Sequence, residues 1–173
     1  MLKNIFLFGA TGFLGTQLKK NLSGNIVPIS LREKDWHNNL PKDANVFVNC
    51  IGKAHDHKGT ATEHDFYFAN YELVKVLFEE FLKSSAQLFI HISSIAAVEE
   101  NERTEVLTEN SVGNPQSHYG KSKKAAEEYK LCFGQAGKGY SQADGAANNH
   151  SQYHFGQATA LFGSIVERHI WLT

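Results

Sequence analysis

The sequence predicts an α/β protein built on a doubly wound, mostly parallel sheet whose C-terminal part is incomplete. Three observations indicate this fold. Short and nearly continuous apolar runs alternate with amphipathic segments, which is typical of a parallel sheet covered by helices on both faces. The first apolar run leads directly into a glycine cluster that opens a helical pattern. The elements then follow the order strand, helix, strand, strand, helix, strand, helix.

Four strands are expected, at residues 4–8, 26–31, 45–51 and 87–92. The first is apolar almost throughout, so we expect it to lie centrally in the sheet. Pro28 lies within the second segment and has no N–H to donate. This strand should therefore lie where one side of the hydrogen-bond ladder is incomplete.

Three helices are expected, at residues 13–22, 65–83 and 118–132. The longest repeats Leu73, Leu77 and Phe81 at intervals of four residues, and a second apolar residue follows each of them. An apolar stripe of this width predicts a helix packed against a sheet.

Length and charge restrict the class of protein. The 173 residues suffice for one domain with a core but are few for two. The 17 basic and 18 acidic residues nearly balance, so we expect neither nucleic acid nor a membrane as partner. No stretch approaches the roughly 18 apolar residues of a bilayer span, which favours a cytoplasmic protein. Cys50 and Cys132 are flanked by apolar residues and are expected to be buried thiols.

The composition changes after Phe133. Residues 134–163 are rich in Gly, Ala, Gln, Asn, Ser and His and contain few apolar residues. Such a segment buries too little apolar surface to offset the entropy lost on ordering. We therefore expect a domain at residues 1–133 and an atypical tail, truncated or foreign to the fold, at residues 134–173. The sheet edge after the fourth strand should then be exposed.

A glycine cluster follows the first strand, in the segment Gly9-Ala10-Thr11-Gly12-Phe13-Leu14-Gly15. At a strand-to-helix turn, Gly9 would allow a sharp bend, Gly12 would let a diphosphate approach the backbone, and Gly15 would let the helix lie close to the strand. The N–H groups at the helix start would face the phosphates. The alternative is that the glycines serve the geometry of the turn alone.

Tyr119 and Lys123 are four residues apart on the last predicted helix and so share one face. A fixed cation beside a phenol favours the phenolate, which would let Tyr119 exchange a proton with a substrate hydroxyl or carbonyl. Ser94 follows the fourth strand, at the edge where open α/β sheets bind ligands, and its hydroxyl would reach the same oxygen. Alone, this Tyr and Lys are more often a surface pair. Together with the glycine turn, they indicate a reaction site.

These motifs resemble the extended short-chain dehydrogenase/reductase family, in its branch of nucleotide-sugar epimerases and dehydratases. The resemblance covers about residues 2–133 and rests on the glycine turn, the two serines at the fourth strand's end and residues 115–123. It implies a Rossmann-like fold. It also implies that Tyr119 is the catalytic acid/base, that Lys123 lowers its pKa and holds the nicotinamide ribose, and that Ser94 hydrogen-bonds the reacting oxygen.

The same resemblance implies NAD or NADP as the cofactor. The implied cofactor-binding residues are Gly9, Thr11, Gly12, Phe13, Leu14, Gly15, Arg32, Cys50, Gly52, Asn70, Tyr119 and Lys123. Members that prefer NAD usually carry an acidic residue at the end of the second strand, where this chain has Arg32. A cation there suits a 2′-phosphate and favours NADP, whereas Glu33 nearby keeps NAD open.

A polar loop contains His55, Asp56, His57 and, further on, His64, which are residue types that bind metals. These residues lack a recognised ligand spacing and occupy the place of the family's cofactor and substrate loop. We therefore expect a solvated loop and no metal.

The resemblance implies an NAD(P)-dependent oxidoreductase-type enzyme acting on a nucleotide-sugar, as an epimerase, a dehydratase or a 4-keto-sugar reductase. Residues 94–98 lack the Tyr-Gly pair often found in epimerases, which favours a reductase slightly. After Phe133 the family continues with further strands and a C-terminal substrate domain, which the sequence does not show. The alternative is a catalytically incompetent dinucleotide-binding fragment. Formation of a homodimer is left open.

Overall fold

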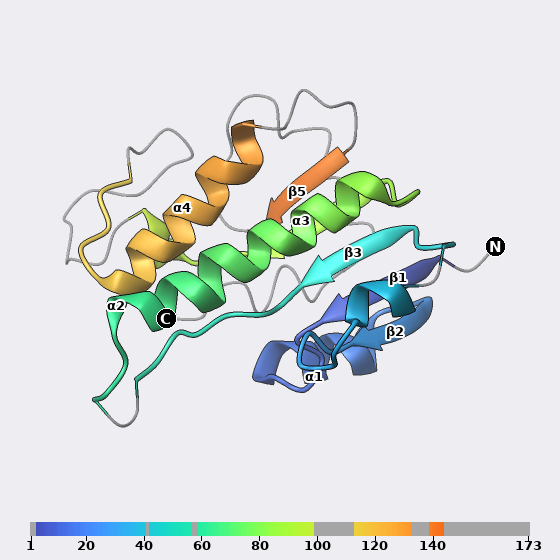
Figure 1. The fold of residues 1–173 in the computed structure, drawn as a ribbon, viewed down its shortest axis with the longest axis horizontal. Helices are drawn as coiled ribbons and strands as arrows, with labels where there is room; N and C mark the ends of the chain where they lie inside the picture. The colour runs from blue at the N-terminus through green and yellow to red at the C-terminus, as the bar shows by residue number, and fades with distance from the viewer. Residues whose placement is uncertain (1–2, 41, 57–58, 99–112, 133–138, 144–173) are drawn as a thin grey trace.

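The computed structural model describes residues 3–40, 42–56, 59–98, 113–132 and 139–143. These residues form a five-stranded sheet in the order β2-β1-β3-β4-β5, and every neighbouring pair of strands is parallel (Figure 1). The strands are β1 (Asn4–Phe8), β2 (Asn25–Ile29), β3 (Val46–Asn49), β4 (Leu88–Ile92) and β5 (Gly139–Ala143). The predicted α/β fold with a doubly wound parallel sheet is confirmed.

The strand order reverses beside β1. The chain leaves β1 toward β2 on one side and returns as β3 on the other side of β1. Ligands of open α/β proteins bind at such a reversal, outside the carboxyl ends of the strands. β2 forms one edge of the sheet, and its Pro28 lies opposite Leu7 of β1. The position predicted from the missing N–H of Pro28 is therefore confirmed.

Apolar side chains pack on both faces of the sheet, as alternating strand residues point to opposite sides. On one face Leu18 and Leu22, at the end of helix α1 (Phe13–Asn21), pack against side chains of β1, β3 and β4. The other face carries phenylalanines of neighbouring strands, with Phe47 of β3 opposite Phe6 and Phe89. Helix α3 (Leu73–Lys83) covers this second face through Leu77, Phe78 and Phe81. The two layers fix α1 and α3 on opposite sides of the sheet.

The segment predicted as one helix from residue 65 to residue 83 begins earlier and is not uniform. Thr62 caps it, because its hydroxyl accepts from the Asp65 N–H while the Asp65 carboxylate accepts from the Thr62 N–H. Helix α2 (Glu63–Tyr67) passes into a π-helical turn, η2 (Phe68–Glu72), before α3. A π-turn is a departure from regular helix that often marks a functional site.

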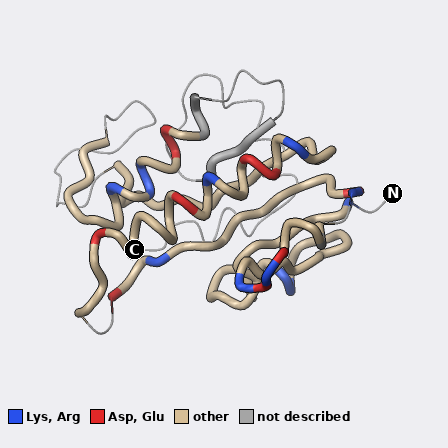
Figure 2. The backbone as a smooth tube through the Cα atoms, viewed as in Figure 1, with Lys and Arg blue, Asp and Glu red and all other residues tan. Residues whose placement is uncertain are grey.

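Helix α4 (His118–Cys132) has the predicted bounds and lies beside α3 (Figure 1). Ser117 precedes it, and its hydroxyl accepts from the Gly120 N–H at 3.0 Å. Figure 2 shows cationic residues along the first half of α4 and acidic residues after them. Among the described residues, no helix has the length and apolar character to cross a membrane.

The composition after residue 133 predicted no further strand, and this prediction is wrong. β5 pairs with β4 along five residue positions, so the β4 edge is covered instead of exposed. Its sequence, Gly-Tyr-Ser-Gln-Ala, has no apolar pattern; backbone pairing with β4 gives it the strand conformation. Residues 144–173 lie outside the described residues, and a domain division at residue 133 stays a prediction.

Candidate functional site

The loops after β1 and β3 touch at Gly9. This residue has φ of +79°, a backbone conformation that favours glycine. A Cβ built on it would lie 2.9 Å from the Cys50 carbonyl carbon, so a side chain there would also collide with the neighbouring loop. The Cys50 N–H donates to the Phe8 carbonyl at 2.9 Å and holds the two strand ends together. Gly9 is therefore required for packing within the protein.

Gly15 is also required for packing, whereas Gly12 is not. A Cβ on Gly15 would lie 2.1 Å from the Gly9 carbonyl oxygen, because this residue of α1 rests on the turn itself. A Cβ on Gly12 would lie 3.3 Å from the Gly9 carbonyl oxygen, and no other atom of the described residues lies within 4 Å of it outside its own neighbours. The space beside Gly12 is thus open to a group from outside the chain.

The same turn presents the start of α1 to that open space. The first N–H groups of a helix have no acceptor within the helix, and its dipole favours a negative charge there. The first turn of α1 contains no acidic residue that would oppose an anion. Thr11 is exposed and Phe13 is 74% exposed, whereas Leu14 packs partly buried against the core. The turn therefore leaves the start of α1 exposed, while Leu14 packs against the core.

Lys123 extends from α4 to the carboxyl ends of β3 and β4. Its side chain is buried, and its Nζ donates to the Ile92 carbonyl at 2.9 Å. A Cβ on Gly52 would lie 3.2 Å from that Nζ, so the loop after β3 also runs directly against the ammonium. Burial raises the pKa of the Cys50 thiol to about 12, although the Lys123 charge acts in the opposite direction. Cys50 therefore stays a neutral thiol near neutral pH.

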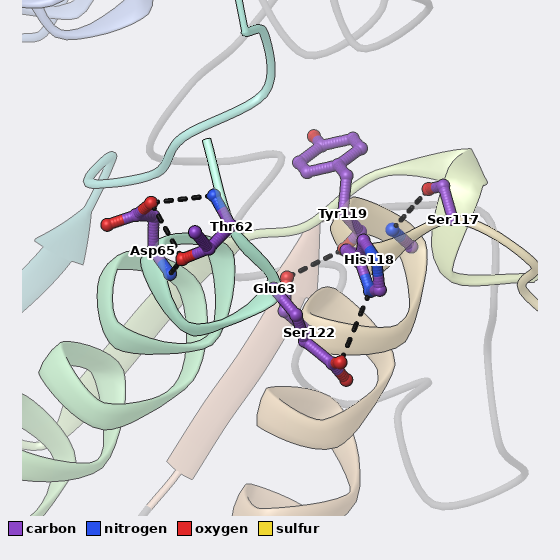
Figure 3. Close-up of polar contacts among 8 residues, drawn as sticks. Thr62, Glu63, Asp65, Ser117, His118, Tyr119 and Ser122 are labelled. Carbon is purple, nitrogen blue, oxygen red and sulfur yellow. Dashed lines mark hydrogen bonds and ion pairs between the residues drawn. The ribbon is translucent and has the colours of Figure 1, made fainter. Parts of the chain in front are cut away.

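Tyr119 lies in the first turn of α4, one helical turn before Lys123, and is half-buried. Figure 3 shows its ring directed away from the ion pair between His118 Nδ1 and Glu63 Oε2, which are 3.7 Å apart. This pair joins the starts of α2 and α4. The phenol thus projects from a helix end that is anchored to a neighbouring helix.

Ser94 follows β4 and caps the short 3-10 helix η3 (Ile95–Ala97), with its Oγ accepting from the Ala96 N–H at 3.3 Å. The η3 helix contacts α4. Ser94 lies two residues after Ile92, which accepts from Lys123. The structure therefore gathers the end of β4, Lys123 and the start of α4 in one region.

Asn70 is fully buried in the π-turn η2 and joins three segments. Its Oδ1 accepts from the Lys53 N–H at 2.7 Å, and its Nδ2 donates to the Lys53 carbonyl at 2.9 Å and to Ser122 Oγ at 3.0 Å. Ser122 Oγ in turn donates to the Tyr119 carbonyl at 2.7 Å. Asn70 thereby fixes the loop after β3 against the turn of α4 that carries Tyr119.

Ser122 and the backbone of Lys53, which complete this network, were not predicted from the sequence. Ser122 lies between the two predicted site residues of α4, and only its burial distinguishes it from other helix serines. Hydrogen bonds to a backbone leave no mark in the sequence, since any residue at position 53 supplies the same N–H and C=O.

Comparison with known proteins identifies the family. The NAD dependent epimerase/dehydratase family matches residues 16–150, well over half of the chain. The chain belongs to this family. The matched range starts directly after Gly15, includes Ser94, Tyr119 and Lys123, and extends past residue 133. No curated protein matches the sequence.

Solved structures with similar folds include those of nucleotide-sugar enzymes. A dTDP-4-dehydrorhamnose reductase of Clostridium acetobutylicum is 25% identical, with a TM-score of 0.66 over 90% of this chain and 60% of that chain. The same enzyme of Bacillus anthracis, in complex with NADP, is 20% identical, with a TM-score of 0.68 over 82% and 53%. A UDP-glucuronic acid 4-epimerase of Bacillus cereus, in complex with NAD, is 18% identical, with a TM-score of 0.66 over 80% and 54%. The chain thus spans less than two thirds of each of these proteins.

Two further predicted features of this epimerase/dehydratase family member concern Arg32 and the histidine-rich segment. Arg32 is exposed in the turn after β2, where its backbone N–H donates to Ser30 Oγ at 3.4 Å. His55 is exposed in the loop after β3, where Asp56 accepts from the Ala61 N–H at 2.6 Å, whereas the exposed His64 lies in helix α2 and not in the expected loop. His57 lies outside the described residues. Among those that are described, no group of three or more His, Cys, Asp or Glu is arranged to hold a metal ion.

Replacing Asn70 with alanine is expected to lower the free energy of unfolding by about 2–3 kcal/mol, because it leaves buried polar groups of Lys53 and Ser122 without this partner. Ser122→Ala removes one hydroxyl from the network and is expected to cost about 1 kcal/mol. Urea unfolding of both variants and the unmodified chain measures the difference. If Asn70→Ala lowered the free energy of unfolding less than Ser122→Ala does, Asn70 would not be the residue that joins these segments.

Proposed function

We propose that this protein is an NAD(P)-dependent oxidoreductase-type enzyme acting on a nucleotide-linked sugar through Ser94, Tyr119 and Lys123. The observation that carries the proposal is the buried Lys123 ammonium at the carboxyl ends of β3 and β4, one helical turn from Tyr119. A buried ammonium costs free energy unless hydrogen bonds and charge partners compensate for it, and such groups often serve a site. Membership of the NAD dependent epimerase/dehydratase family supports the same function.

The residues that would hold the dinucleotide come from the turns after β1 and β2, the loop after β3, the π-turn η2 and helix α4. The open face of Gly12 and the start of α1 suit the diphosphate, with Gly9, Thr11, Phe13, Leu14 and Gly15 forming that turn. Cys50 and Gly52 of the loop after β3, Asn70 behind them, Arg32, Tyr119 and Lys123 complete the proposed cofactor contacts. NAD or NADP is present in the structures of the similar epimerase and reductase, which supports a nicotinamide cofactor here.

Tyr119 is the proposed acid/base. When bound, the nicotinamide ring supplies a hydride acceptor or donor for the sugar carbon. As that carbon is reduced, the Tyr119 hydroxyl would give its proton to the substrate oxygen; as that carbon is oxidised, the Tyr119 phenolate would take a proton from it. The nearby Lys123 cation favours the phenolate form, and its bond to Ile92 holds it in place. Ser94 Oγ would hydrogen-bond the same substrate oxygen.

The type of reaction is inferred from a short segment after β4. Residues 94–98 lack the Tyr-Gly pair often found in epimerases, while the similar structures include both dTDP-4-dehydrorhamnose reductases and a UDP-glucuronic acid 4-epimerase. We therefore place reduction of a 4-keto-sugar ahead of epimerisation and dehydration. A nucleotide-sugar would be the substrate in each case.

Arg32→Ala is expected to weaken binding of NADP more than binding of NAD, by about tenfold in the ratio of the two dissociation constants. A guanidinium at the end of β2 pairs with a 2′-phosphate, which NAD lacks. Fluorescence titration of the unmodified chain and the variant with both coenzymes measures the ratio, and Lys34→Ala, an exposed cation two residues away, is the control. Equal losses for NADP and NAD would remove Arg32 from coenzyme selection.

A second candidate function is dinucleotide binding without turnover. The chain spans 60% and 53% of the two similar reductases, so a large part of each of those proteins has no counterpart in it. A binding module would bind NAD(P)H and leave nucleotide-sugars unchanged, whereas an enzyme would couple the two. A cytoplasmic location and a homodimer stay predictions, which cell fractionation and light scattering would test.

A further inference from the structure

Glu127 is a buried acidic residue that the proposed mechanism does not use. It is 8% exposed, and its Oε1 accepts a hydrogen bond from Ser93 Oγ. The next residue, Glu128, is different: its side chain is 63% exposed and lies 3.7 Å from Lys124 Nζ. Two adjacent glutamates on one helix thus have opposite environments, and only the first reaches the sheet.

The position of Glu127 on α4 connects it with the proposed site. Tyr119, Lys123 and Glu127 follow one another at intervals of four residues, so they form a row along one face of the helix. Lys123 contacts the carbonyl of Ile92, and Glu127 contacts the side chain of Ser93. Two successive turns of α4 are therefore bonded to two successive residues at the end of β4.

The residue that follows in the chain is Ser94. Its N–H shares a peptide bond with the carbonyl of Ser93, so a fixed Ser93 limits where the Ser94 hydroxyl can lie. Lys123 holds the end of β4 through the Ile92 carbonyl, and Glu127, one turn further along α4, holds it through the Ser93 side chain. Both contacts together set the distance between the β4 end and the helix that carries Tyr119.

We propose that Glu127 is a positioning residue, which holds Ser93 and thereby sets Ser94 against Tyr119. The inference rests on the proposed function, because it assigns Ser94 and Tyr119 to one substrate oxygen. Glu127 itself does not touch the substrate in this account. Its effect is on geometry, and displacement of a reacting group by about 1 Å can reduce the rate by as much as a hundredfold.

Four variants separate positioning from stability. Glu127→Ala removes the acceptor and Ser93→Ala removes the donor of the same hydrogen bond. Glu127→Gln keeps an oxygen that accepts from Ser93 at nearly the same size. Glu128→Gln changes the exposed neighbour in the same way and is the matched control. A fifth variant, which carries both alanine substitutions, should lose no more turnover than either single variant, because both substitutions break the same contact.

Two measurements are made on each full-length variant, below its melting temperature. The first is hydrogen exchange of the backbone amides of residues 92–98, which Glu127→Ala and Ser93→Ala should accelerate by about tenfold. The second is turnover, for which these variants should lose about tenfold or more in kcat with little change in the KM of the sugar. Glu127→Gln should stay within about threefold of the unmodified chain, and Glu128→Gln should match it.

The proposal is overturned if exchange at residues 92–98 is unchanged in both alanine variants, since the contact then fixes nothing. It is also overturned if exchange accelerates while kcat stays as in the unmodified chain, since Glu127 then only stabilises the fold. Absence of turnover in the unmodified chain would instead refute the proposed function. The exchange data alone would then show whether the contact holds the end of β4 in place. If Glu127→Ala does not fold, Ser93→Ala is compared with Glu127→Gln instead.

Discussion

Tyr119→Phe is expected to lower turnover by about a hundredfold or more while leaving the affinity for NAD(P)H nearly unchanged. The variant removes only the hydroxyl that would move the proton and keeps the ring that packs at the start of α4. Loss in kcat with constant cofactor affinity is the pattern of a group that acts in the transition state. Steady-state kinetics and a fluorescence titration of the cofactor measure the two effects.

Tyr129→Phe is the matched control on the same helix. Its hydroxyl donates to Glu79 Oε1 at 3.0 Å, on the side where α4 meets α3. Turnover of this variant should equal that of the unmodified chain, even if its stability falls. Equal turnover of Tyr119→Phe and Tyr129→Phe would remove Tyr119 from the mechanism.

The glycine turn gives the second large effect, because Gly12 and Gly15 respond to the same substitution in different ways. Gly15→Val places a Cβ 2.1 Å from the Gly9 carbonyl oxygen, so we expect a loss of about 3 kcal/mol or more in the free energy of unfolding. Gly12→Val meets one oxygen at 3.3 Å and should fold, with little loss of stability. Its side chain fills the open space, so NAD(P)H should bind at least about tenfold more weakly.

Thermal unfolding and calorimetric titration of both variants test this contrast. A folded Gly12→Val variant with the cofactor affinity of the unmodified chain would show that the open face of Gly12 does not hold the diphosphate. A stable Gly15→Val variant would contradict the close packing of α1 on the turn. The unmodified chain, titrated in parallel, supplies the reference affinity.

The fold was largely predictable because its strands are apolar on both faces. Runs such as Asn4–Phe8 and Val46–Asn49 stand out from the polar loops that follow them, and a Pro at position 28 places β2 at an edge. β5 was not predictable in this way. Its residues Gly139–Ala143 carry no apolar alternation, and it is a strand because β4 offers an unpaired edge.

The candidate site was predictable where a backbone or a helical repeat imposes a residue type. Glycine at positions 9 and 15 is required by close backbone contact, and a Tyr and a Lys four apart share a helix face. The contacts that hold these residues in place, made by Glu127 and Asn70, correspond to no such pattern in the sequence. Glu127 and Glu128 are neighbouring residues of the same type, yet only Glu127 is buried, and no pattern in the sequence indicated the π-turn that contains the buried Asn70.

Transfer of deuterium between the nicotinamide ring and the sugar tests the central claim most directly. The unmodified chain is incubated with labelled NADPH or NADH and a panel of 4-keto nucleotide-sugars, and, in the reverse direction, with oxidised cofactor and nucleotide-sugars labelled at C4. Mass spectrometry then follows the label. We expect label transfer to at least one substrate by the unmodified chain and loss of that transfer in Tyr119→Phe. Binding of the cofactor with no transfer in either direction would refute the proposed enzyme and leave a dinucleotide-binding module.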